Sequence, residues 1–535
     1  MSSSPARSLV ALVGRGEAAG FAIALLALVL ALRWGPLAGN WGEQLTPWPD
    51  AAEHVAGAQA IAESGNYFLQ LGPWRVQPRY PPGFSLLLAP ALRAGLPGDQ
   101  AWRLGALFEW GIVLLLAVGT MALTRRFAPL ADPGRRRRAG RWAGAGAAAT
   151  WLLSPIAATQ GSFVVSDQPT LLVVLLGGLA MARGAAGQTP AASLWWAASG
   201  LLIGLAAAMR VIEGVITLVA LAPVVWVFAR RAGGRRAAAA LPSFVAAAAI
   251  PAALTCWLLA RTGFAPTRWS TYAIWEPWSS YSFGRMFRWL HLTHGSLWVV
   301  DAEGVSRGLP NGRVVTQVLA GWPGLSEFHY VGFLWPALGA AAAVWGARAL
   351  RRIEPGLGPW CLALGLYVVL HLATALFFVW PLPRLLLGVF LIQTLAFWAA
   401  VAAAFARGEK ALRPIAFLAA LAVLTSGVAL LVGRAQGYAP FDEENQATRR
   451  AVADWLARQP DASPRDKVPF DSVRAHALGL LSADQLARVS VWGSLRESWH
   501  FGVLRRHGFV CRIPGYGWDL DPAIRPRGPG EGGAE

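Results

Sequence analysis

The chain has 535 residues, of which 55% are hydrophobic and 14% are charged, with a mean hydropathy of +0.43. Soluble domains carry about a quarter charged residues, so this composition excludes an ordinary soluble enzyme. Almost all of the positive charge behind the formal net charge of +18 is Arg, and the basic patches sit in short loops between apolar runs, which favours a membrane protein over a nucleic-acid-binding one.

Apolar runs long enough to cross a bilayer recur along the chain and predict about eleven transmembrane helices. The runs are continuous rather than alternating, which excludes membrane-spanning β-strands. We therefore expect an all-α polytopic membrane protein. The predicted spans are 17–33, 101–124, 142–158, 164–183, 192–209, 212–229, 239–260, 330–347, 356–379, 385–406 and 414–433.

The basic loops predict the orientation of these spans. Arginines crowd the segments 125–141, 230–236, 348–352 and 407–413, and all four fall on one side if the N-terminus is cytoplasmic. The first apolar run lacks a small-residue cleavage site, so a retained helix is expected. The prediction is a multi-pass protein of the inner or plasma membrane with a cytoplasmic N-terminus and an extracytoplasmic C-terminus.

Two long loops and the tail then lie on the outer side. The membrane domain is expected over 1–435, with a first external, catalytic loop at 34–100 and a second external loop at 261–329. The dense Trp, Tyr and Arg of the second loop indicate outer-face helices in the membrane interface. The remaining 436–535 predict a small extramembrane region whose Gly/Pro-rich end is disordered.

The first external loop contains the cluster that can do chemistry. Asp50 opens an Ala-rich helical pattern that ends before Gly65, and Glu53 and His54 share its face. A carboxylate there can take a proton from an acceptor hydroxyl that lies within about 3 Å. The spacing of Asp50 and Glu53 also fits a capping box. The two interpretations are compatible, because a capping Asp at a helix N-terminus can face a substrate.

This loop contains Asp50 with His54, then Ala58, Ser64-Gly65-Asn66-Tyr67, and Tyr80-Pro81-Pro82-Gly83-Phe84-Ser85-Leu86-Leu87. The series resembles the first external loop of GT-C superfamily glycosyltransferases, in the branch of protein O-mannosyltransferases and lipid A aminoarabinose transferases. In that family the loop begins with an acidic residue proposed as catalytic base. Here Ala51 replaces a frequent second acid and His54 a usual Tyr, so the sequence does not support a divalent metal and the cofactor is left open.

Three later segments also resemble motifs of the family, and all lie on the predicted outer face. They contain Asp167 at the start of the fourth span, Arg210 at the end of the fifth, and Arg384 at the start of a late span. Each has an alternative. The Asp167 segment could be an ordinary capped helix start, Arg210 could snorkel or pair with Glu213, and Arg384 could be an interfacial anchor.

The resemblance implies transfer of a sugar from a polyprenyl-phosphate-linked donor to an acceptor hydroxyl on the extracytoplasmic face, with inversion. Asp50 is the expected catalytic base, and the guanidinium groups match phosphate oxygens. The expected partners are the lipid-linked donor and membrane lipids, with no nucleic acid and with the acceptor left open. The expected substrate-binding residues are Glu53, His54, Arg79, Tyr80, Asp167, Arg210 and Arg384.

Two other classes stay open. Arg210 and Glu213 could line the pathway of a lipid or sugar transporter or flippase, although the two halves show no matching pair of broken helices. A non-catalytic membrane protein that keeps the GT-C fold is the other class, because Ala51 and His54 depart from the family pattern. Consumption of a lipid-linked sugar in vesicles would separate an enzyme from both.

Overall fold

A computed structural model describes the greater part of the chain. The described residues are 15–33, 50–71, 74–76, 78, 80–154, 157, 164–187, 191–231, 234–262, 334–377, 386–409, 414, 417, 421, 442–458, 470, 472–487, 511–513 and 518–520. The predicted site residues Arg79 and Arg384 lie outside them. So do nearly all of the second external loop, most of the predicted span 414–433, and the predicted disordered end.

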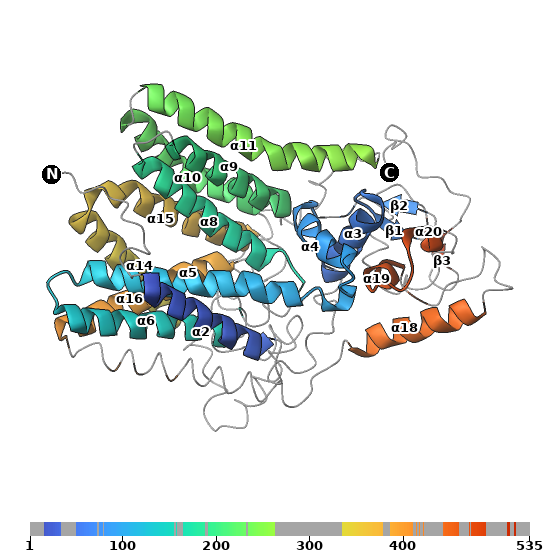
Figure 1. Ribbon diagram of the computed structural model, residues 1–535, viewed down its shortest axis with the longest axis horizontal. Coiled ribbons are helices and arrows are strands. Elements are labelled where there is room, and N and C mark those ends of the chain that lie inside the picture. The colour runs from blue at the N-terminus through green and yellow to red at the C-terminus, as the bar shows by residue number, and fades with distance from the viewer. Residues whose placement is uncertain are drawn as a thin grey trace.

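The described part of the membrane domain is a bundle of long helices (Figure 1). Eight segments of the described residues are long and apolar enough to cross a membrane, which confirms a multi-pass membrane protein, while the count of about eleven stays a prediction. Helices α6 and α14 coincide with two other predicted spans but are not among these eight. The long helices are α2 (Arg15–Arg33), α5 (Arg103–Phe127), α6 (Pro133–Leu153), α8 (Asp167–Ala186), α9 (Ala191–Met209), α10 (Val211–Arg231), α11 (Gly234–Arg261), α14 (Leu334–Ile353), α15 (Gly358–Phe377) and α16 (Leu387–Arg407).

Polar contacts gather several of the basic loops at one end of the bundle. Glu17 of α2 accepts hydrogen bonds from Arg125 at 2.9 Å and from Arg141 at 2.8 Å. Arg126 pairs with Glu354, which precedes the short helix η7 (Pro355–Leu357). Arg407 donates to the backbone oxygen of residue 127 at 2.9 Å. The connections after α5, α14 and α16 therefore lie together, as the charge pattern predicted.

The described parts of the predicted first external loop and of the C-terminal region lie together at the opposite end of the bundle (Figure 1). Two short antiparallel hairpins depart from the all-α expectation: β1 pairs with β2 through Leu69↔Val76, and β3 with β4 through Cys511↔Leu520. The elements here are α3 (Asp50–Ser64), β1 (Leu69–Leu71), β2 (Trp74–Val76), α4 (Gly83–Arg93), η2 (Gly98–Gln100), α18 (Asp442–Ala457), α19 (Ser472–Ala477), α20 (Ala483–Leu486), β3 (Cys511–Ile513) and β4 (Trp518–Leu520).

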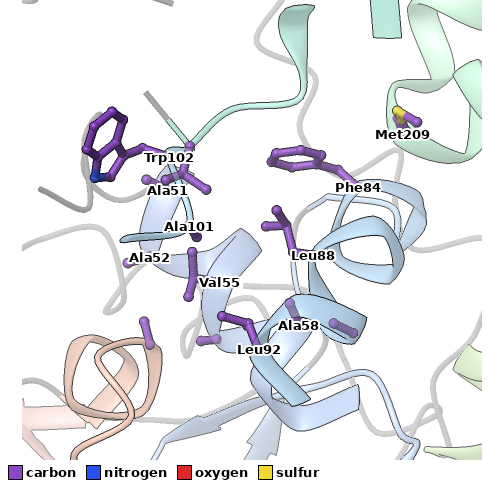
Figure 2. Close-up of a cluster of buried hydrophobic side chains, with 14 of the residues drawn as sticks. Ala51, Ala52, Val55, Ala58, Phe84, Leu88, Leu92, Ala101, Trp102 and Met209 are labelled. Carbon is purple, nitrogen blue, oxygen red and sulfur yellow. The ribbon is translucent and has the colours of Figure 1, made fainter. Parts of the chain in front are cut away.

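Helix α3 is buried on most of its surface, because two other helices cover it. On one side Val55 and Ala58 face Leu88 and Leu92 of α4 (Figure 2). On another side α19 adds Val473 and Ala477 to the same apolar cluster. At residue 98 a Cβ atom would lie 1.7 Å from the backbone oxygen of Ala477, so glycine is required for this contact. The C-terminal region, which sequence reasoning left without a role, therefore forms part of the core around α3.

Polar contacts add to this docking. The Glu63 carboxylate at the end of α3 accepts from the backbone N–H of Ala483 at 3.2 Å and lies 3.3 Å from Nε2 of the buried His476. Arg449 of α18 pairs with Asp99 of η2. Burial opposes ionisation of Glu63, but the hydrogen bonds and the His476 charge outweigh it, so the pKa of Glu63 lies below its usual 4.5.

A fully buried ion pair joins α2 to α5 inside the membrane domain. Arg33 donates to the two carboxylate oxygens of Glu109 in a bidentate arrangement, both at 2.7 Å, and neither side chain is exposed. Arg33 also donates to the backbone oxygen of Leu152 at 3.3 Å, which closes α6 onto the pair. Three helices are therefore held in register by one guanidinium group.

The Glu63 contact makes the docking of the C-terminal region dependent on pH. Because the folded-state pKa is lowered, its stabilisation is present above pH 4.5 and is lost as pH falls through the folded value. We expect Glu63→Gln to lower the unfolding temperature in detergent at pH 7 and to converge with the wild type at lower pH. Glu409→Gln, which changes an exposed pair with Arg407, is the control and should have little effect. A Glu63→Gln deficit that persists unchanged at pH 3.5 would contradict the assignment.

Removal of one charge of the Arg33–Glu109 pair should destabilise the protein more than removal of both. Glu109→Gln leaves a buried guanidinium unpaired and should cost about 3–5 kcal/mol. The double variant Arg33→Met/Glu109→Leu removes both charges and should recover most of that loss. Thermal unfolding of the purified protein in detergent measures both. Equal destabilisation by the single and double variants would show that the pair acts through packing alone.

Candidate functional site

The candidate site begins at the N-terminus of α3. The helix starts at Asp50 and ends at Ser64, as predicted, and Gly65 follows with φ 69°, the left-handed conformation of a helix stop. Asp50 and Glu53 lie in its first turn. Asp50 is 8% exposed, while Glu53 and His54 are each 1% exposed. Asp50 is thus the most exposed of these three residues.

An aromatic cluster covers His54. Its ring centroid lies 4.5 Å from that of Tyr80 and 5.0 Å from that of Phe84. The backbone of the same turn is held as well, since Ser85 Oγ donates to the backbone oxygen of His54 at 2.9 Å and Tyr67 OH donates to that of Tyr80 at 2.8 Å. The turn Tyr80-Pro81-Pro82-Gly83 therefore packs directly against the first turns of α3.

The same turn lies against the end of α9. At residue 83 a Cβ atom would lie 2.6 Å from the backbone carbonyl of Ala208, so only glycine permits this approach. Phe84 and Met209 belong to one buried cluster and lie near each other in Figure 2. The next residue after Met209 is Arg210, which separates α9 from α10. This contact brings the first external loop next to the second group of predicted residues.

That second group is an ion pair. Arg210 pairs with Asp167, the first residue of α8, whose side chain is 5% exposed against 26% for Arg210. Ser166 occupies the position before α8 but makes no side-chain capping bond, so the start of this helix is not the ordinary Ser-capped one. Thr170 Oγ1 contacts Met209 Sδ at 3.5 Å, which holds α8 beside the α9–α10 junction.

Two residues that sequence reasoning did not select complete this region. Tyr367 OH donates to a carboxylate oxygen of Glu213 at 2.6 Å, and Nε2 of His371 lies 3.2 Å from the same oxygen. Their spacing of four residues within the apolar span α15 was the available signal, because it places two polar groups on one helix face.

The structure thus brings Asp50, Glu53, His54 and Tyr80 together on one side of the Gly83–Ala208 contact, with Asp167 and Arg210 on the other. Arg79 and Arg384 lie outside the described residues. Among the residues that are described, no group of three or more His, Cys, Asp or Glu side chains could hold a metal ion. The roles of the site residues remain predictions.

Comparisons with known proteins bear on the fold. No protein-family model and no curated protein matches the sequence. Among solved structures, ArnT from Cupriavidus metallidurans in the apo state is similar at TM-score 0.50 and 16% identity, over 86% of this chain and 85% of that chain. The same ArnT bound to undecaprenyl phosphate gives 0.49 and 15%, over 91% of both chains.

The Archaeoglobus fulgidus oligosaccharyltransferase tethered with an acceptor peptide gives a TM-score of 0.49 at 12% identity, over 93% of this chain and 67% of that chain. At these identities the similarity concerns the fold alone. Together with the helix arrangement described above, the match to apo ArnT shows that the chain has the fold of that protein.

Proposed function

We propose that the protein is a membrane glycosyltransferase that moves a sugar from a polyprenyl-phosphate-linked donor to an acceptor hydroxyl on the extracytoplasmic face. The observation that carries the proposal is the Gly83–Ala208 contact, in which the segment that follows Asp50 and α3 packs on the residues just before Arg210, the partner of Asp167. In this proposal the Asp50 carboxylate and the partly exposed Arg210 guanidinium border one region at the outer end of the bundle. These are the two groups that such a transfer requires.

In the proposed reaction the Asp50 carboxylate accepts the proton of the acceptor hydroxyl. The hydroxyl oxygen attacks the anomeric carbon from the face opposite the phosphate, so that a new glycosidic bond forms with inversion. The bond between the anomeric carbon and the phosphate oxygen breaks, and the polyprenyl phosphate leaves with that electron pair. Catalysis then comes chiefly from positioning and from neutralising the developing phosphate charge.

Arg210 is the described residue that we assign to the donor phosphate, with Arg79 and Arg384 as further candidates. Its guanidinium can form bidentate hydrogen bonds with phosphate oxygens. Asp167 would act as a positioning residue, because its buried carboxylate holds the guanidinium at the end of α8. The rings of His54 and Tyr80, packed on each other beside Asp50, would form one wall of the sugar site.

Undecaprenyl phosphate is the natural probe for the donor site, since ArnT has been solved with this lipid bound. The apolar surfaces of the membrane helices would accept its polyprenyl chain, while the phosphate would lie at Arg210. A transporter would carry the sugar-linked form of this lipid without consuming the sugar. A non-catalytic protein of the same fold would do neither.

The catalytic assignment is tested by Asp50→Asn. Asparagine starts helices about as well as aspartate, so the fold should persist, whereas the base is removed. We expect consumption of polyprenyl-phosphate sugars extracted from host membranes to fall by roughly 10²–10⁴-fold in vesicles. Unfolding temperatures of variant and wild type should agree. Full activity in Asp50→Asn would show that another group takes the proton.

The donor-phosphate assignment is tested by Arg210→Gln. Loss of a charged hydrogen bond of about 1.5–3 kcal/mol should weaken undecaprenyl phosphate binding by roughly 10–100-fold. Arg183→Gln makes the same chemical change at the other end of α8, where Arg183 lies over Trp195, and should bind as the wild type does. Titration of the lipid into protein in nanodiscs, followed by native mass spectrometry, measures both. Equal binding by all three proteins would remove Arg210 from the phosphate site.

A further inference from the structure

The Glu213–Tyr367–His371 cluster lies inside the membrane domain and is not used by the mechanism above. Glu213 lies in the first turn of α10, and Tyr367 and His371 lie one turn apart on α15. The side chains of Glu213 and His371 are 13% and 7% exposed. An ionisable group in a membrane helix is costly, so a cluster of this kind is expected to have a function.

A purely structural role accounts for part of the cluster. A carboxylate in the first turn of a helix is stabilised by the helix dipole, and its hydrogen bond with Tyr367 ties α10 to α15. Neither effect needs His371, because the hydroxyl already binds the carboxylate at 2.6 Å. The imidazole adds a group whose charge ordinarily changes between about pH 5 and 8. In this structure the imidazole lies 3.2 Å from the Glu213 carboxylate oxygen.

Arg210 connects this cluster to the proposed phosphate site. Its backbone oxygen accepts from Gly214 N at 3.1 Å, so Arg210 is the residue that starts α10, and its charge acts on Glu213 three residues later. Arg210 thus lies between two carboxylates, Asp167 of α8 and Glu213 of α10. When His371 is neutral, the side chains of Asp167, Arg210, Glu213 and His371 together carry a net charge of about −1, which opposes an incoming phosphate. With protonated His371 the net charge is about zero.

We infer that His371 is a proton-binding positioning residue of the donor site, which takes up a proton from solution when a lipid phosphate binds at Arg210. The protonated imidazole neutralises Glu213, so that the guanidinium of Arg210 serves Asp167 and the phosphate. No covalent bond changes in this step. The inference rests on the proposed function, because it assumes that the phosphate binds at Arg210.

The charged groups around His371 are few in the described helices. The start of α8 contributes Asp167, and the junction of α9 and α10 contributes Arg210 and Glu213. Helix α15 itself contributes Tyr367. Helix α16 meets Tyr367 at Gly388, where a Cβ atom would lie 2.4 Å from the hydroxyl. The arginines of α14 and α16 lie in their C-terminal parts, at the end of the bundle with the basic loops. His371 is thus the group in this set whose charge ordinarily changes between pH 5 and 8.

The coupling between proton uptake and phosphate binding limits how steeply the binding affinity can change with pH. Uptake of one proton per bound phosphate strengthens binding as pH falls, by at most about tenfold per pH unit. The phosphate monoester also gains a proton near pH 6, which lowers its own charge and acts in the opposite direction. The informative quantity is therefore the ratio of wild-type to variant affinity at each pH, in which the titration of the lipid cancels.

The experiment measures undecaprenyl phosphate binding to the full-length protein in phosphatidylcholine nanodiscs from pH 5.5 to 8.5. We expect the ratio of wild-type to His371→Gln affinity to rise severalfold per pH unit as pH falls. Tyr367→Phe is the matched control, because it removes a hydrogen bond to the same carboxylate without removing a titrating charge, and it should keep the wild-type pH dependence. Glu213→Gln removes the charge that the imidazole neutralises, so it should bind more tightly than the wild type at pH 8 with the pH dependence of His371→Gln.

The outcomes separate this inference from the proposed function. Binding by the wild type with a pH profile identical to those of His371→Gln and Glu213→Gln would overturn the role of His371 and leave the donor site standing. Absence of binding by the wild type at every pH would overturn both. Should His371→Gln fail to fold, Glu213→Gln alone decides, since a pH profile identical to that of the wild type would contradict the coupling.

Discussion

A charge in the interior of a membrane domain must be paired, and this constraint decides which helices of this protein are neighbours. Arg33 and Glu109 join α2 to α5 through a bidentate contact with no exposure to solvent. Asp167 and Arg210 join the start of α8 to the α9–α10 junction. Glu213 with Tyr367 and His371 joins α10 to α15. Apolar faces can slide past one another in a bilayer, whereas each of these contacts fixes a register.

Close backbone approaches then attach the external elements to this frame. Glycine at 83 lets the start of α4 lie on the end of α9, and glycine at 98 lets η2 lie on α19. Because of these two contacts, α3 is enclosed between α4 and the C-terminal region while its first residue, Asp50, remains near the end of the membrane bundle. A helix held on two sides is a rigid support for a catalytic carboxylate. The described part of the C-terminal region therefore bears on the proposed chemistry by supporting α3.

The proposed site combines side chains from two parts of the fold. The first external loop supplies a carboxylate with packed aromatic rings, and the membrane helices supply a guanidinium held by a buried carboxylate. A fold shared with ArnT does not by itself give an activity, because function depends on the groups that the fold carries. In the proposed transfer, Asp50 and Arg210 act at the same end of the bundle, and a proton on His371 offsets the negative charge of the two carboxylates around Arg210.

Local and periodic features of the molecule could be predicted from the sequence. Hydropathy located the long helices of the membrane bundle that the structure describes, the arginine-rich loops indicated which connections lie together, and Asp50 and Gly65 marked the limits of α3, because each of these signals is contained in neighbouring residues. Contacts between distant residues could not be predicted in this way. Sequence spacing offered Glu213 as a partner of Arg210, and the fold adds Asp167, 43 residues earlier in the chain, while Glu213 also accepts from Tyr367 of α15. The docking of α19 on α3 spans more than 400 residues. Only the packed helices decide such pairs, since each depends on which faces meet in three dimensions.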